Sequence, residues 1–222
     1  MEELRKVVGK YRHDNFATVS VGSIIYQIPE SQYEKFKIRC PEFFKALERH
    51  KKSPEADFYH NCVAFDLFLF WVSEERLPDL IDDVSEKSGS TKDECAGRLH
   101  DSLFELWMFA GRYSIPSLQN DAMRSLLEVL GCTIVKPAQL EVPLHFVPEL
   151  PVGNAMLLEV AHDLLAGSYP ASEVQQFAEL DGFLLRFITL VGGHGPFDPK
   201  ETSPSRQFAD GRDVRAFMVR EE

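Results

Sequence analysis

Residues 104–127 read FELWMFAGRYSIPSLQNDAMRSLL. Apolar residues recur at helical spacing on both sides of the proline in SIPSL, which predicts two tightly joined helices. Proline lacks an N–H group and has a fixed φ, so Pro116 suits the first turn of the second helix. Both helices are apolar on nearly every side, and such helices are buried between layers. The stretch has no obvious catalytic residue. It could form an active-site scaffold, a cofactor pocket or the core of a docking module, and the rest of the sequence is needed to distinguish these alternatives.

Length and composition predict a folded domain with an extension. The chain has 222 residues, of which 44% are hydrophobic and 11% aromatic, and it can bury a core without disulfides. Its net charge of −11 disfavours direct binding to nucleic acid. Cysteines occur singly, with no close pair, which indicates reduced thiols of the cytosol or nucleus. Because the N-terminus lacks a signal-peptide core and no apolar run reaches about 18 residues, we expect a soluble cytoplasmic and/or nuclear protein without membrane contact.

The N-terminal part predicts a β-hairpin followed by short helices. Residues 16–28, FATVSVGSIIYQI, alternate apolar and polar side chains, which is typical of strands with one buried face. Gly22 suits the first central position of a type II′ turn, where φ is positive. A short helix is expected around Tyr33, and a clearer one begins at Pro41. A further short strand is expected at 57–60.

Two segments lie between the hairpin and the 104–127 stretch. Residues 63–72 are dense in apolar side chains; a buried helix and a parallel strand both fit, and the length favours a helix. Residues 78–97 are hydrophilic and are expected to form an inserted loop. Thr91 and Glu94 have the spacing of a capping box that would start the next helix.

The C-terminal part predicts a proline-rich connection, two helices and a tail. Residues 131–154 contain four prolines, which favours extended, turn-rich chain over a long helix. Helices are expected at 156–165 and 172–191, the second opened by a capping box at Ser172. Residues 193–222 are expected to be a loop-like, mobile tail, in which Val214, Phe217 and Met218 could anchor a short final helix.

Motifs for catalysis and metal binding are missing from the sequence. It has no P-loop, no dinucleotide-binding fingerprint and no nucleophile elbow. The glycine-rich segment 192–195 follows a predicted helix rather than opening one, so it is not expected to cradle a phosphate. His60 and Cys62 supply two metal ligands where a structural zinc site needs four, and the acidic segment 79–86 is expected to stay solvated. The two tryptophans lie on apolar segments and are expected in the core. We predict no catalytic residue, no metal site and no cofactor, and a dispersed Cys/His arrangement stays open.

The order of these parts resembles the BTB (POZ) domain family, especially the divergent forms abundant in filamentous fungi. The matching segments are VSVGSIIYQI, CPEFFKAL, AFDLFLFWV and LWMFAGRYSIPSLQNDAM. In the family, a strand pair bearing V-x-V-G leads to a helix ending in S-P-F-F, then to an aromatic-rich helix, and the pattern closes on L-Y-x-x-A-x-x-Y-x-I-x-x-L-Q-x-x-A. The match covers about residues 14–130. Pro29 stands where members usually have a His, and Cys40 replaces the usual Ser.

The resemblance implies an α+β fold: a BTB/POZ-like helical cluster capped by a small β-sheet, with a C-terminal helical extension. It divides the chain into an N-terminal segment (1–13), the BTB/POZ-like domain (14–131), the extension (132–192) and the tail (193–222). In this fold the 104–127 stretch serves packing. The implied function is a non-catalytic protein–protein interaction module for dimerisation or scaffolding, with a second copy of the chain as the expected partner. We expect its interaction surface at Val7, Val8, Tyr33 and Phe36.

Two alternatives to this function remain. The first is a substrate adaptor of a cullin-type ubiquitin ligase, since BTB adaptors offer a hydrophobic-x-Glu contact after the helix that contains the Phe pair. Here Glu55 has Ser53 two positions before it, so the apolar anchor is missing and we expect cullin binding to be weak or absent. The second is an enzyme that uses a cleft between the BTB-like part and the C-terminal helices, near His60, Cys62 or His162.

Overall fold

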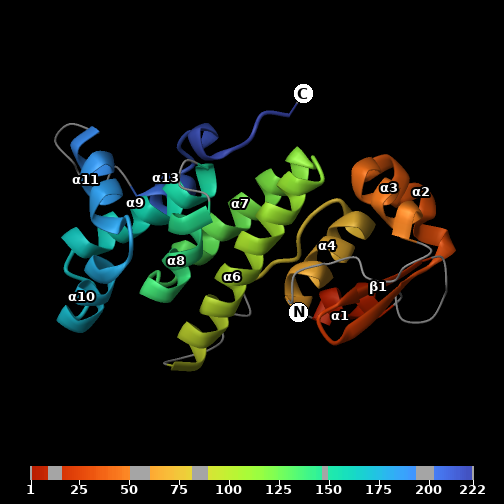
Figure 1. Cartoon of the computed structure of the whole chain (residues 1–222), viewed down its shortest axis with the longest axis horizontal. Helices are drawn as coiled ribbons and strands as arrows, with labels where there is room; N and C mark the ends of the chain where they lie inside the picture. The colour runs from red at the N-terminus through yellow and green to blue at the C-terminus, as the bar shows by residue number, and fades with distance from the viewer. Residues whose placement is uncertain are drawn as a thin grey trace. The chain divides into compact units, whose positions relative to one another are not determined.

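Helices make up most of the chain in the computed structural model, which describes residues 2–9, 17–50, 61–81, 90–146, 150–193 and 203–221. Within these ranges the strands form one two-stranded antiparallel sheet (Figure 1). The predicted mixed α+β class is therefore confirmed, while the strand expected at 57–60 lies outside the described residues. The elements are α1 (Glu2–Gly9), β1 (Ala17–Val21), β2 (Ile24–Ile28), the 3₁₀ helix η2 (Glu30–Gln32), α2 (Tyr33–Arg39), α3 (Pro41–His50), α4 (Cys62–Glu74), α6 (Ser90–Arg112), α7 (Pro116–Leu130), α8 (Pro137–Phe146), α9 (Pro151–Leu165), α10 (Ala171–Glu179), α11 (Phe183–Gly193), α13 (Pro204–Ala209) and the 3₁₀ helix η3 (Arg215–Phe217).

The described residues group into two compact units. Unit 1 draws on three segments: Met1–Leu80, Ser102–Ala122 and Arg220–Glu222. Unit 2 draws on Ile81–Asp101 and Met123–Val219. Segments of the two units alternate along the chain. The division expected from the sequence instead placed each domain in one continuous range.

The predicted hairpin is confirmed. The strands β1 and β2 pair antiparallel, with Val21 opposite Ile24, and Gly22 in the connecting turn has the expected positive φ, 57°. Val19 and Tyr26 face each other and are both buried, while the neighbouring Ile25 is exposed. This alternation follows from the period of two along a strand. One face of the hairpin therefore belongs to the core of unit 1.

Aromatic side chains form the centre of unit 1. Residues 63–72, where the sequence fitted either a helix or a strand, belong to the helix α4. The side chain of Asn61 caps the start of α4 by accepting hydrogen bonds from the N–H groups of Val63 and Ala64. Phe68 of α4 lies 5.0 Å from Phe43 of α3, measured between ring centroids, in an edge-to-face arrangement. Such aromatic contacts add to the stabilisation that comes from burying the rings. Within the described part of the chain, further rings in contact with one or both of these two include Phe36, Phe65, Phe109 and Tyr113.

The turn that joins α6 to α7 is the feature that the 104–127 stretch predicted. Ser114 has a left-handed φ of 53°; its N–H donates to the carbonyl of Gly111, and the N–H of Ile115 donates to that of Ala110. This bonding pattern is a Schellman motif, which satisfies the last carbonyls of α6. Pro116 then starts α7, as predicted. Ile115 and Leu118, which lies in the first turn of α7, are buried.

The proline-rich connection was predicted wrongly. Residues 137–146 form the helix α8 instead of extended chain. Pro137 occupies its first position, where a missing N–H costs nothing. Pro143 lies inside the helix and removes one backbone hydrogen bond, but Leu140 and Leu144 are buried on the same helix. Tertiary burial therefore outweighs the local preference.

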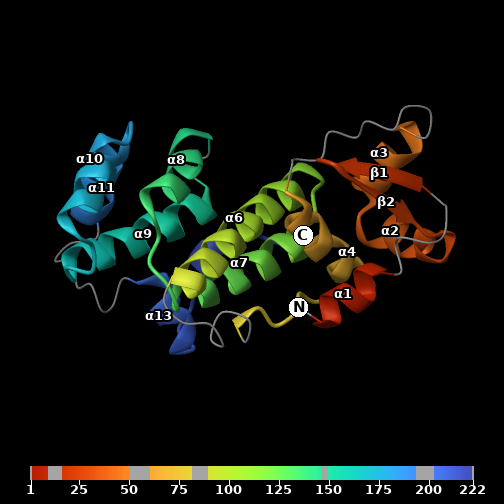
Figure 2. The same ribbon diagram turned by 90° about the horizontal axis from the view of Figure 1, so that it is seen from below.

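The single helix expected at 172–191 was also predicted wrongly. It is divided into α10 and α11, because Gly182 adopts a φ of 75° between them. The two helices lie side by side (Figure 2). The expected capping box is not formed: α10 is preceded by Pro170, without a side-chain cap, and Ser172 lies inside the helix. The helix expected at 156–165 is confirmed, but α9 already begins at Pro151.

Two segments expected to be loops contain helix. Of the hydrophilic segment 78–97, residues 82–89 lie outside the described residues, and α6 already begins at Ser90, one residue before the predicted cap Thr91. Of the C-terminal tail, residues 203–221 are described. They contain α13 and η3, both of which contact α9. Phe217 in η3 is buried, as expected for an anchor of a short final helix. This part of the tail belongs to the packed structure.

The turn after α6 yields a prediction for stability. Ser114 holds a left-handed backbone, which costs a residue with a Cβ roughly 1 kcal/mol relative to glycine. We expect Ser114→Gly to raise the free energy of unfolding, measured by urea denaturation, by about 0.5–1 kcal/mol. The matched control is Ser117→Gly, three residues later in α7, which should lower it by a similar amount because glycine disfavours a helix. Destabilisation by both changes would contradict the assignment.

A buried histidine yields a prediction for pH dependence. His100 in α6 is 2% exposed, and neither ring nitrogen has a hydrogen-bond partner among the described residues. Burial lowers its pKa to about 4, whereas the unfolded chain protonates this side chain near 6.5. Stability is therefore lost as the pH falls from about 6.5 towards 4. His100→Leu should remove this loss, so that its advantage over the wild type grows by roughly 3 kcal/mol between pH 7 and pH 4. Parallel pH profiles in urea denaturation would refute this.

Candidate functional site

The residues predicted as an interaction surface do not form one in the structure. Val7 and Val8 of α1 and Phe36 of α2 are buried in unit 1. Tyr33 is partly exposed, and its ring packs edge-to-face on Phe44. The apolar residues of α1 contribute to the core, because α1 contacts α4. The prediction is therefore corrected for Val7, Val8 and Phe36: within one chain they are core residues.

Three exposed apolar side chains of unit 2 lie together on α11, while Leu165 of α9 and Val174 of α10 are exposed singly. Leu184, Leu185 and Ile188 are 51%, 74% and 65% exposed, and we call these three the α11 apolar face. Phe183 on the same helix is buried, with its ring 5.4 Å from that of Phe177 in α10. One side of α11 is thus packed inside unit 2, and the other presents leucine and isoleucine to solvent.

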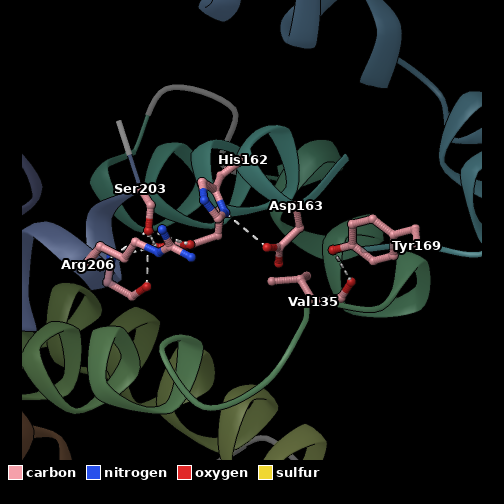
Figure 3. A network of polar contacts seen from close by, with 8 residues as sticks. Val135, His162, Asp163, Tyr169, Ser203 and Arg206 are labelled. Carbon is pink, nitrogen blue, oxygen red and sulfur yellow. Dashed lines mark hydrogen bonds and ion pairs between the residues drawn. The ribbon is translucent and has the colours of Figure 1, made fainter. Parts of the chain in front are cut away.

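A polar cavity lies between α9, α13 and the chain that follows α7, all within unit 2 (Figure 3). Its volume is about 310 Å³, within the range of small-molecule sites. We call it the α9–α13 cavity. It is lined by Leu130, Gly131, Cys132, Thr133, Ile134, Glu159, His162, Asp163, Ser203, Ser205, Arg206 and Ala209.

Glu159 fixes the C-terminal segment on α9. The Ser203 hydroxyl lies 3.0 and 3.1 Å from the two carboxylate oxygens, and the N–H of Ser205 also donates to the carboxylate. Ser203 in turn accepts a hydrogen bond from the N–H of Arg206 and so caps α13. Burial raises the pKa of Glu159, and its hydrogen bonds from Ser205 and Ser203 oppose this effect. The hydroxyl of Ser203 is therefore engaged in structure and is not a free nucleophile.

His162 and Asp163 form a second polar pair in the cavity. The ring Nδ1 of His162 lies 3.0 Å from a carboxylate oxygen of Asp163, as Figure 3 shows. Burial raises the pKa of Asp163, and the hydrogen bond from His162 partly offsets this. A carboxylate that holds a histidine ring in one tautomer is an arrangement used in both catalysis and ligand binding. His162 was named in the sequence-based enzyme alternative; Glu159, Ser203 and Ser205 were not.

The other predicted chemistry is not brought together. Cys62 donates its thiol hydrogen to the carbonyl of Val21, and burial raises its pKa, which opposes formation of a thiolate. His60 lies outside the described residues. Among those that are described, no group of three or more His, Cys, Asp or Glu side chains is arranged to hold a metal ion. Trp71 and Trp107 are buried, so the expectation that they belong to the core is confirmed.

The comparisons with known proteins find no relative: no family model, curated protein or solved structure matches the chain. The BTB/POZ assignment therefore stays a prediction from the sequence pattern. In the part of the chain that the structure describes, every helix is too short or too polar to cross a membrane.

The anchoring of α13 yields a prediction. Ser203→Ala removes a buried hydroxyl that both donates to Glu159 and caps α13, so we expect it to lower the free energy of unfolding by about 1–3 kcal/mol. Ser172→Ala is the matched control: its side chain is exposed and caps no helix, and it should change the value by less than about 0.5 kcal/mol. Urea denaturation measures both. Equal losses for the two variants would contradict the role of Ser203.

Proposed function

We propose that this chain is a non-catalytic protein–protein interaction module of the BTB/POZ type, which dimerises or serves as a scaffold. The observation that carries the proposal is the α11 apolar face. Contiguous exposed apolar side chains on a folded protein mark interaction sites, since covering them removes apolar surface from water. The order of sequence elements from the hairpin to α7 supports the family, and it is independent of this surface.

A second copy of the chain is the partner that we propose for this face. The helix α11 has a single charged residue, Arg186, so two copies can bring their apolar faces together while burying few charges. A two-fold arrangement needs only that the same patch meets itself. The net charge of −11 on each copy opposes association and is screened by salt. We therefore expect dimerisation to strengthen as ionic strength rises.

An enzyme and a cullin adaptor are the two alternative functions. The α9–α13 cavity, with its His162–Asp163 pair, is the observation that favours an enzyme. Against it, the Ser203 hydroxyl is committed to Glu159, and Cys132 makes no hydrogen bond to His162 in the cavity that both line. For the cullin-adaptor alternative, the loop with Ser53 and Glu55 lies outside the described residues. Weak or absent cullin binding stays our expectation.

The dimerisation proposal predicts the effect of charges on α11. The double change Leu185→Glu and Ile188→Glu should weaken self-association at least a hundredfold, because two carboxylates would be desolvated in the contact. Sedimentation velocity at micromolar concentrations measures the effect. The control is Ser172→Glu with Gln176→Glu, which adds the same charge to the exposed surface of α10 and should leave association within a few-fold of wild type.

Two outcomes would contradict this proposal. A wild-type chain that stays monomeric at high micromolar concentration and high salt would remove the second copy as partner. A double α11 variant that associates as tightly as the wild type would place the interface elsewhere. Near-ultraviolet circular dichroism of each variant shows whether its tertiary structure is retained.

A further inference from the structure

The α9–α13 cavity is lined by a histidine, His162, with one ring nitrogen hydrogen-bonded and the other without a partner among the described residues. His162 is 6% exposed, and its Nδ1 is held by Asp163 at 3.0 Å. Since a carboxylate can only accept, Nδ1 carries the hydrogen, and in the uncharged ring Nε2 is an acceptor. Nε2 has no partner among the described residues, yet it is not one of their fully enclosed unsatisfied atoms, which include both ring nitrogens of His100. Nε2 is therefore an unpartnered acceptor of a nearly buried residue that lines a cavity.

Most other polar groups around the cavity are also acceptors. Glu159 and Asp163 line it with carboxylates one helical turn apart on α9. The hydroxyl of Thr133 donates to the carbonyl of Val129 at 3.3 Å, which leaves only its lone pairs for a ligand. The helix α7 ends at Leu130 on the cavity wall, and a helix C-terminus carries partial negative charge. Among the side-chain donors of the lining, the hydroxyls of Ser203 and Ser205 are used by Glu159. The others are the guanidinium of Arg206 and the weak thiol donor of Cys132.

The charges around the cavity, like its hydrogen-bonding groups, favour a cationic ligand. Two carboxylates, Glu159 and Asp163, face one permanent cation, Arg206, across the lining. Burial raises the pKa of both carboxyl groups, which means that existing partners do not fully compensate their ionised forms. An additional cation in the cavity would provide that compensation.

We propose that the α9–α13 cavity binds a small organic cation that carries a primary ammonium group. The ammonium group supplies three donors and a positive charge to a lining that is short of both. An anion would meet two carboxylates, and an apolar molecule would leave the buried acceptors unpaired. A metal ion is disfavoured, because the described His, Cys, Asp and Glu side chains form no group able to ligate one. This site is separate from the α11 apolar face and does not depend on the proposed dimer.

A comparison of three probes of equal length tests the proposal on the wild-type protein. These are n-butylammonium chloride, butan-1-ol and sodium butyrate, each titrated at constant ionic strength while the imidazole resonances of His162 are followed by NMR. We expect saturable shifts with n-butylammonium alone. The absence of any shift with n-butylammonium, or equal shifts with all three probes, would overturn the proposal.

A pair of variants tests the role of the buried carboxylate. Asp163→Asn should weaken n-butylammonium binding at least tenfold, because it removes one negative charge and the group that orients His162. Asp181→Asn is the control: it makes the same change at an exposed residue between α10 and α11, and binding should stay within about twofold of wild type. Equal affinity in the two variants would refute the site. If Asp163→Asn fails to fold, the comparison of probes on the wild-type protein still decides.

Discussion

The tight turn between α6 and α7 is the constraint on which the packing of these two helices depends. Two helices that are apolar on most sides are stable in water only if other elements cover them. The Schellman motif at Ser114 reverses the chain within a few residues and satisfies the carbonyls that end α6. Ile115 and Leu118 are thereby placed in the core. A stretch that carries no catalytic residue thus has a sufficient explanation in packing, and chemistry has to be sought elsewhere in the chain.

Local signals were enough to predict the hairpin, α3 and the start of α7. The period-two alternation around Gly22, the proline that opens α3 and the proline that opens α7 each specify a backbone conformation with few competitors. The C-terminal half could not be predicted in this way. Pro143 argues against a helix locally, but α8 is kept by the burial of its leucines, and Gly182 divides a continuous apolar pattern. Both outcomes are decided by tertiary packing, which a single sequence does not display.

The candidate sites show the same limit. An apolar pattern cannot distinguish residues covered by their own chain, such as Val8, from residues left exposed, such as Leu185. The α9–α13 cavity unites Glu159 with Ser203, 44 residues further along, and no spacing rule connects them. One signal was available: Glu159 lies within the apolar run 155–161 of α9, and a buried carboxylate requires partners. The core helices are therefore covered by the chain itself, whereas α11 leaves the side chains of Leu184, Leu185 and Ile188 exposed.

Hydrogen–deuterium exchange followed by mass spectrometry, run over a range of protein concentrations, tests this separation most directly. Amides of residues 103–127 should be among the slowest to exchange at every concentration, since they open only when the core does. Amides of residues 184–190 should exchange faster in dilute protein and become more protected as the concentration rises. If residues 184–190 were as protected as 103–127 in the most dilute sample, with no dependence on concentration, the α11 apolar face would not be a free interaction surface and the central claim would be contradicted.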